Sequence, residues 1–424
     1  MNKSGTTNYM KTKISRNFGL WCVLSSWLFV ATFRMIPVGG VWGDLNIHVI
    51  ILLIGWLLIF ILSYYLGSYV KIYPKSLIAN FDTKTYNTWI LLTSVVATIG
   101  ALLIAFEFAV LRGYGFDTNV ALIRAQEAAN AEFRVEGSLV SGIGRLMTPA
   151  IIVAWNIYIL CKDFINPTHR WTLFIATSIV LWQQLSFEGG RFAIAALIIS
   201  TLFSWIYKTK KYNHTNLNIK FVVISIIAII FFGYAFLGRA ENQSLDLGVF
   251  YETFSKHFDI DSSKSFLLND GKIGPVSFSL VMFWHYLTHS FNEFQVILFH
   301  EIDYAGGLYQ FPHLGQAASI LFDVSLGYNV FAELPNPGTY VTFAGANYVD
   351  FGYIGLYISG FVLGTLCGIS SNSLRAGILR PLSLTAPLFL TIAIFTPIYS
   401  MLPNLWPCFV YFLIVKIYKV NLSK

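Results

Sequence analysis

The first residues that could do chemistry stand in a short polar turn between two apolar runs. Phe187-Glu-Gly-Gly-Arg191 joins the runs Thr172–Phe187 and Phe192–Tyr207. A helix of about 16 residues is about 24 Å long, whereas the hydrocarbon layer of a membrane is about 30 Å thick. If these runs cross a membrane, the turn lies below its surface, where charges are costly and commonly functional. We predict catalytic roles for Glu188 and Arg191; the alternative is a mutual ion pair that caps the hairpin.

Further arginines gather on the same predicted side of the apolar runs. Arg239 and Glu241 directly follow an apolar run, and Arg145 and Arg112 are assigned to that side as well. The planar guanidinium group suits bidentate binding of phosphate or carboxylate. We predict a catalytic, phosphate-binding role for Arg239, and substrate binding for Arg145, Arg112 and Glu241. The alternatives are a snorkelling arginine for Arg239 and ion pairs with nearby carboxylates.

The segment Pro275–Phe299 predicts an amphipathic helix with three titratable side chains on one face. His285, His289 and Glu293 follow at i, i+4 and i+8. Such a face can bind a metal ion or supply a base to a hydroxyl group. The His-Glu-x-x-His pattern of zinc proteases is absent, so we predict no metal site and keep His289 as a candidate catalytic residue. The alternative is the wet face of an interfacial helix.

The composition excludes a soluble protein. Of the 424 residues, 56% are hydrophobic and only 12% are charged, whereas soluble domains have about 25% charged residues. The net charge of +7 is spread over short loops, as in membrane proteins, and does not indicate nucleic-acid binding. The four cysteines lie in or beside apolar runs, which gives no disulfide framework. No nucleotide-binding motif is present, and we expect no cofactor.

Ten apolar runs are long enough to be read as membrane spans, which predicts an all-α polytopic membrane protein. The predicted spans are Phe18–Ile36, Ile47–Val70, Trp89–Val110, Leu139–Leu160, Thr172–Phe187, Phe192–Tyr207, Phe221–Leu237, Phe351–Gly368, Leu382–Leu402 and Trp406–Val415. With alternating spans and a cytoplasmic N-terminus, 18 of the 28 Lys and Arg residues fall on the cytoplasmic side. This asymmetry predicts that both termini are cytoplasmic.

The chain is expected to form a single integral-membrane domain, 1–424, with a large, partly helical outer loop, 238–349, between spans seven and eight. A loop of that length is usually functional rather than a connector. Near its end, Asn336, Tyr340 and Asn347 suit sugar hydroxyls and are predicted to bind substrate; the alternative is ordinary capping of turns by Asn.

Three glycines mark the eighth predicted span as a packing helix. Gly360, Gly364 and Gly368 recur every four residues. Small residues at this spacing let two membrane helices approach closely. We predict a helix–helix contact here and no chemistry.

The region Leu334-Pro-Asn-Pro-Gly-Thr-Tyr-Val-Thr-Phe343, followed by Asn347-Tyr-Val-Asp-Phe-Gly-Tyr-Ile-Gly355, resembles part of the Wzy-type polymerases of bacterial oligosaccharide repeat units. The similarity in layout covers nearly the whole chain, while the sharp motif is confined to these two segments. The Glu-Gly-Gly-Arg turn resembles the arginine turn of that family, with Arg191 as its arginine. The matching positions of the loop motif are Asn336, Thr339, Thr342, Tyr348, Asp350, Phe351 and Gly352.

The resemblance implies a metal-independent glycosyltransferase of the bacterial inner (cytoplasmic) membrane. Donor and acceptor would be glycans linked to undecaprenyl pyrophosphate, polymerised into O-antigen or capsular polysaccharide at the periplasmic face. Asp350 would then contribute to substrate binding, and a chain-length regulator in the same membrane would be a partner. Two alternatives remain: an O-antigen ligase, and a polysaccharide or lipid-carrier transporter without chemistry. Transporters often contain internal repeats, and none is visible here.

Overall fold

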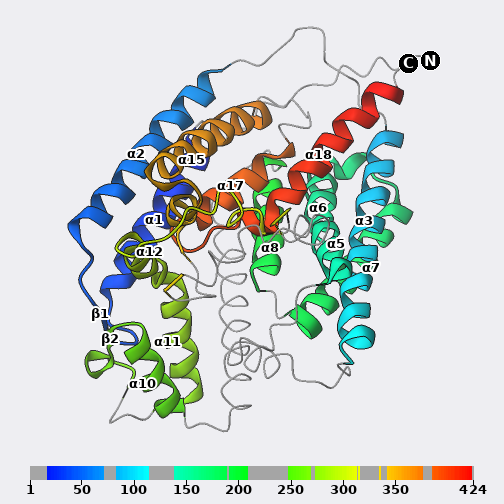
Figure 1. Ribbon diagram of the computed structural model, residues 1–424. Coiled ribbons are helices and arrows are strands. Elements are labelled where there is room, and N and C mark those ends of the chain that lie inside the picture. The colour runs from blue at the N-terminus through cyan, green and yellow to red at the C-terminus, as the bar shows by residue number, and fades with distance from the viewer. Residues whose placement is uncertain are drawn as a thin grey trace.

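The computed structural model is built almost wholly from helices (Figure 1). It describes residues 17–70, 83–113, 138–188, 191–208, 247–268, 273–312, 314–315, 334–335, 341–375 and 384–422. The longer helices are α1 (Phe18–Met35), α2 (Ile47–Tyr69), α3 (Thr83–Phe106), α5 (Leu139–Met147), α6 (Ala150–Cys161), α7 (Pro167–Gln183), α8 (Arg191–Lys208), α10 (Leu247–His257), α11 (Pro275–Thr288), α12 (Ser290–Leu298), α15 (Phe343–Arg375), α17 (Ala386–Phe395) and α18 (Leu402–Leu422).

Short elements complete the described part of the chain. Two π-helical turns, η1 (Glu107–Leu111) and η4 (Gln184–Glu188), extend α3 and α7. Two 3₁₀ turns, η3 (Lys162–Phe164) and η5 (Ser262–Lys264), and two strands, β1 (Val41–Trp42) and β2 (Ile260–Asp261), are the remainder. The strands pair antiparallel and join the α1–α2 connection to the long loop.

Five described helices are long and apolar enough to cross a membrane, which confirms the expected class of helical membrane protein. They span Phe18–Met35, Ile47–Tyr69, Lys84–Leu111, Leu139–Phe164 and Phe343–Ser373. Large apolar side chains of α2 stay exposed at helical spacing: Ile47, Ile51, Ile54, Leu58, Leu62 and Leu66. A stripe of this kind would be unfavourable in water and suits contact with lipid chains.

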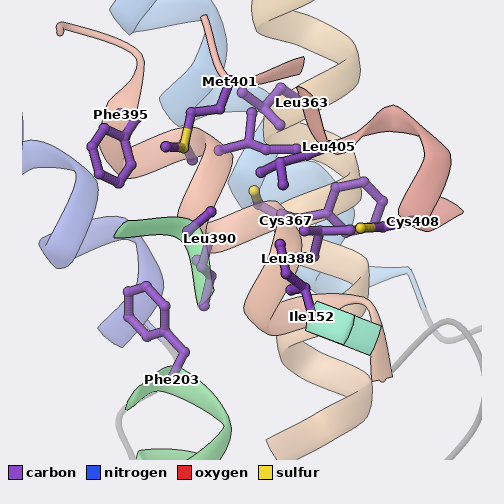
Figure 2. Packing of buried hydrophobic residues seen from close by; sticks show 14 of the residues in the cluster. Ile152, Phe203, Leu363, Cys367, Leu388, Leu390, Phe395, Met401, Leu405 and Cys408 are labelled. Atoms are coloured by element: carbon purple, nitrogen blue, oxygen red, sulfur yellow. The ribbon is translucent and has the colours of Figure 1, made fainter. Parts of the chain in front are cut away.

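The helices form two groups joined by a central one. In Figure 1, α1, α2 and α15 lie on one side and α3, α5, α6 and α7 on the other, with α8, α17 and α18 between them. Leu388 and Leu390 of α17 belong to one apolar cluster with Leu363 of α15, Leu405 of α18 and Phe203 of α8 (Figure 2). Helix α17 is almost wholly buried and packs on α1, α15 and α8, and α8 in turn packs on α6 of the second group.

The predicted glycine ridge is confirmed as the contact between α15 and α2. A Cβ atom on Gly364 would lie 2.5 Å from the carbonyl oxygen of Phe60, and one on Gly368 would lie 2.2 Å from that of Tyr64. Only glycine lets the two backbones approach this closely. Residue numbers increase in the same direction along both helices of this contact, so α2 and α15 run parallel.

The eighth predicted span begins too late, because α15 starts at Phe343 rather than at Phe351, inside the range assigned to the loop. The helix has a kink at Phe351 and Gly352, where Gly352 has φ 62° and ψ −151°. This conformation is accessible essentially to glycine alone. A Cβ atom at Gly352 would also lie 2.8 Å from the ring of Tyr304. The kink therefore requires glycine at position 352. The pattern of apolar residues does not show whether the helix begins before or after this kink.

Two other predicted segments are each divided into two helices. The span Leu139–Leu160 consists of α5 and α6, which meet at Thr148 and Pro149. Pro149 lacks the N–H group that a continuous helix would need. The predicted helix Pro275–Phe299 consists of α11 and α12, which meet at His289. Helices α10, α11 and α12 lie within the range 238–349 that the sequence assigns to the long loop.

Candidate functional site

The end of α3 carries a buried ion pair. Both the Nε and the Nη2 atoms of Arg112 donate to Glu107 Oε1, at 3.0 Å and 2.5 Å, and Glu107 is only 1% exposed. The hydroxyl group of Ser138, the N-cap of α5, donates to the other carboxylate oxygen. Arg112 is predicted to bind substrate. In the structure it already has a carboxylate partner, Glu107, within its own chain. The pair lies at the end of a membrane-length helix, and each buried charge needs the other because an unpaired buried charge is costly.

A second π-helical turn packs beside the first. The rings of Phe108 in η1 and Phe187 in η4 are 5.8 Å apart. The structure therefore brings the backbone of Glu188, and the start of α8 at Arg191, to the end of α3 that carries Glu107. The side chains of Glu188 and Arg191 lie outside the described residues. Single π-helical turns within α-helices occur frequently at functional sites.

Arg145 belongs to the same group of helices. It lies in α5, which packs on α3 so closely that a Cβ atom on Gly144 would be 2.8 Å from the carbonyl oxygen of Gly100. The next residue, Leu146, accepts a hydrogen bond of 2.9 Å from the hydroxyl of Tyr411 in α18. Arg145 thus lies in a helix that contacts α3 through Gly144 and α18 through Leu146.

The carboxylate of Asp350 accepts hydrogen bonds from backbone N–H groups of its own chain. Its carboxylate accepts from the N–H groups of Gly307 at 3.0 Å, Tyr309 at 2.8 Å and Gln310 at 3.0 Å. It is fully buried immediately before the kink of α15. Asp350 was predicted to bind substrate; in the structure it fixes the loop 305–311 against the kink.

Asn347 lies one helical turn earlier and is also buried. Its amide donates to the carbonyl oxygen of Phe343 at 2.7 Å. The residue lines an apolar groove, described below, so it is placed at a cavity, as a binding residue requires.

The His285, His289 and Glu293 face is buried, so its interpretation as a wet helix face is wrong. The two imidazole rings stack at 4.9 Å, and both are enclosed by protein. Burial lowers the pKa of His289 to about 4 and holds the pKa of His285 well below its usual value. Both rings are therefore neutral at pH 7. Their burial leaves the candidate base His289 without an open path to a substrate hydroxyl.

An open groove of about 700 Å³ follows the membrane-crossing part of α15. The groove is lined by Ile354, Ile358 and Val362 of α15 and by residues of α17 and α18. The lining is apolar except at a few positions, and the groove lies on the face of α15 opposite the glycine ridge. Phe311, the last residue of the loop held by Asp350, also lines the groove.

Several predicted site residues lie outside the described part of the chain: Arg239, Glu241, Asn336 and Tyr340. Among the described residues, no group of three or more His, Cys, Asp or Glu side chains could hold a metal ion. Sequence reasoning missed Glu107 and Ser138. A carboxylate inside the apolar run Trp89–Val110 was a signal that could have identified Glu107.

In comparisons with known proteins, no family model, no curated protein and no solved structure matched this chain.

Proposed function

We propose that this chain is a glycosyltransferase that polymerises oligosaccharide repeat units linked to undecaprenyl pyrophosphate. The proposal includes ten membrane spans, both termini in the cytoplasm, and a periplasmic loop at 238–349. The product is an O-antigen or a capsular polysaccharide. Reporter fusions at Asn213 and Arg375 are expected to be cytoplasmic and one at Ser265 periplasmic; a cytoplasmic signal at Ser265 would contradict this topology.

One observation carries the proposal: the two π-helical turns meet at one end of the helical group. The contact between Phe108 and Phe187 brings the turn that leads to Arg191 next to Glu107 and Arg112. An arginine at this end of the membrane helices, Arg191, suits an anionic head group better than an apolar cargo. A pyrophosphate is such a group.

The proposed glycosyl transfer uses a carboxylate as the base and arginines to stabilise the leaving pyrophosphate. The acceptor hydroxyl oxygen attacks the anomeric carbon of the donor sugar, while the bond from that carbon to the pyrophosphate oxygen breaks. The hydroxyl proton passes to a carboxylate, for which Glu188 is the candidate. Negative charge develops on the departing lipid pyrophosphate, and Arg191, with Arg239 and Arg145, stabilises it. The leaving group needs no metal ion in this scheme.

The direct test uses purified protein and lipid-linked repeat units. Replacement Arg191→Ala is expected to abolish polymer formation, and Arg191→Lys is expected to reduce it strongly, because lysine keeps the charge but loses the planar fork. Activity is expected to survive EDTA. Full-length polymer from a stably inserted Arg191→Ala protein would overturn the assignment of the site.

A deletion strain separates the proposal from its alternatives. The surface glycan of a strain without this chain is examined on a gel. A single repeat unit on the anchor indicates loss of a polymerase, whereas no repeat unit indicates loss of a ligase or of a lipid-carrier transporter.

A further inference from the structure

Helix α11 contains no Asp, Glu, Lys or Arg residue, although it lies in the range that the sequence assigns to the long outer loop. On its inner face, Phe278, Val281 and Trp284 belong to an apolar cluster with residues of β1, β2 and α10. A helix that is apolar on all sides is either buried in protein or placed in a membrane. The surroundings of the opposite face therefore decide where α11 lies.

The opposite face of α11 is apolar as well. Val276, Leu280, Phe283 and Leu287 follow at i, i+4, i+7 and i+11, which places them on one side of the helix. Val276 is 75% exposed and Leu280 39%, while Phe283 and Leu287 are partly buried. These four residues are called the α11 stripe below. Exposed apolar surface of this kind is unfavourable in water and marks a contact with a partner or a membrane.

The α11 stripe continues the exposed surface of α1, against which α11 packs (Figure 1). The rings of Phe29 and Phe33 in α1 stack at 5.3 Å, and the ring of Phe283 lies 6.5 Å from that of Phe33. Phe29 is 51% exposed on a helix that is long and apolar enough to cross a membrane. One row of aromatic rings thus joins the lipid-facing side of α1 to the α11 stripe.

The two helices run antiparallel. Phe291, shortly after α11, contacts Trp27 with the ring centres 5.9 Å apart. The indole Nε1 of Trp284 donates to the carbonyl oxygen of Phe33 at 2.9 Å. Residue numbers therefore fall along α11 as they rise along α1. The C-terminal end of α11 lies beside the C-terminal end of α1, and the N-terminal end of α11 extends beyond it.

This register places part of the α11 stripe at membrane depth. Leu280 lies one helical turn, about 5 Å, beyond Trp284, and Val276 lies about two turns beyond it. Helix α1 has 18 residues, which is a length of about 27 Å, whereas the hydrocarbon layer is about 30 Å thick. A bilayer around α1 therefore reaches the level of Leu280, and Val276 comes close to its surface.

The neighbouring helix α10 has a different kind of exposed surface. Lys256 and Glu252 form an ion pair of 2.8 Å on it, and their side chains are 74% and 57% exposed. Lys264 and Asp261, in the segment that follows, form a second exposed pair at 3.1 Å. Exposed charges are costly in hydrocarbon and are solvated in water. The side of α10 that carries them thus faces solvent, whereas the α11 stripe carries no charge.

We infer that the α11 stripe lies in the bilayer leaflet that surrounds the C-terminal end of α1, with phospholipid acyl chains as its partner. Helix α11 is then a membrane-embedded helix of the long loop that does not cross the bilayer. Contacts between membrane helices are enriched in small residues, and the stripe has none, which favours lipid over a second helix as the occupant. This inference does not depend on the proposed glycosyl transfer.

The test measures contact with lipid by quenching, because bromine atoms on acyl chains quench only fluorophores that they touch. A dansyl-bearing amino acid is incorporated at one position of the full-length protein, which is reconstituted in phosphatidylcholine liposomes with or without brominated acyl chains. Leu28, 67% exposed on α1, is the lipid-facing reference, and Lys256 is the solvent-facing control. The probe at Leu280 is expected to be quenched by bromine as strongly as the probe at Leu28. Quenching at Val276 is expected to be weaker, and the probe at Lys256 should respond to aqueous iodide instead.

A pair of matched variants tests whether the apolar character of the stripe holds α11 in the bilayer. Leu280→Glu is expected to reduce bromine quenching of a probe at Val276 and to expose that probe to iodide, because a carboxylate is costly in hydrocarbon. Val249→Glu, at a position that is 55% exposed on α10, is expected to leave both signals unchanged. If Leu280→Glu does not insert stably, the comparison of probes in the unsubstituted stripe decides alone.

Two results would overturn the inference. Quenching of the probes at Val276 and Leu280 by iodide but not by brominated lipid would place the stripe in water. Shielding from both quenchers would mean that protein covers the stripe. That cover would be a second copy of the chain if the shielding disappears when the protein is diluted in lipid, and another segment of the same chain if it persists.

Discussion

The two polar regions of this molecule satisfy their polar groups in opposite ways. At the end of α3, Glu107, Arg112 and Ser138 pair with one another inside the protein. Trp406, which lines the groove, and Gln310, which precedes the lining residue Phe311, keep donors that no described residue accepts from. The first arrangement is complete without a ligand and indicates a rigid support for the neighbouring Arg191 turn. The second leaves two buried donors without a partner among the described residues, which is unfavourable. Buried polar groups in this protein are thus not all paired in the same way.

The largest effect on stability is expected from breaking the ion pair. Replacement Glu107→Gln leaves Arg112 buried without its counter-charge, which costs about 3–5 kcal/mol when one partner of a buried pair is removed. Unfolding in mixed detergent micelles measures this loss. The double variant Glu107→Leu with Arg112→Met is expected to recover most of it, because no charge is then left unpaired.

The double variant also tests whether this region is only a support. A support predicts that polymer formation recovers together with stability. A stable double variant that makes no polymer would place the ion pair itself in the chemistry and would break the contrast between the two regions.

The buried histidines predict a dependence of stability on acidity. His289 has a pKa of about 4 in the folded protein, below its ordinary value of 6.5. As pH falls from 6.5 towards 4, the unfolded chain binds a proton that the folded chain does not, so the folded state loses about 3 kcal/mol. Stability is expected to be independent of this group above pH 6.5. In His289→Gln, unfolding measured between pH 7 and pH 4 should show a shallower slope; an unchanged slope would mean that His289 is protonated in the fold.

The carboxylate beside the groove is expected to have a smaller effect. Asp350→Asn keeps one acceptor oxygen but loses the charge, and one amide N–H then faces the N–H groups of the loop 305–311. The expected loss is about 2 kcal/mol, the range for hydrogen bonds to a charged group. Limited proteolysis of the loop reports it locally. Loss of substrate binding with an unaltered loop would instead restore the role in substrate binding predicted from the sequence.

The smallest effect on stability is expected from filling the groove. Val362→Trp adds a large ring at a position that is 46% exposed, so the free energy of unfolding should change by about 0.5 kcal/mol or less. Val95→Trp, at 43% exposure on α3, is the matched control away from the groove. Labelling of α15 by a phospholipid that carries a photoreactive acyl chain is expected to fall in the first variant and not in the second. Equal labelling in both would mean that the groove is an ordinary part of the lipid-facing surface.

The sequence by itself determined the class of the protein and part of its packing. Apolar runs of bilayer length identify membrane helices because a spanning segment must satisfy its backbone internally and bury few charges. The glycine spacing predicted a close helix–helix contact of α15, because that spacing depends only on the helical repeat, whereas the partner α2 is known only from the structure. Glu188, Arg191, Arg145 and Arg112 were selected as residues of interest from their position near the ends of apolar runs.

The tertiary structure alone decided which of these residues have partners. The pair of Arg112 with Glu107 needs a π-helical turn, and its contact with Ser138 needs α5 packed on α3. The burial of His285 and His289 depends on the packing of α11, which a helical wheel does not show. The unpaired donors of Trp406 and Gln310 became visible only once loop, kink and α18 were placed together. Periodicity records which face of a helix is apolar, but it contains no information on what that face meets.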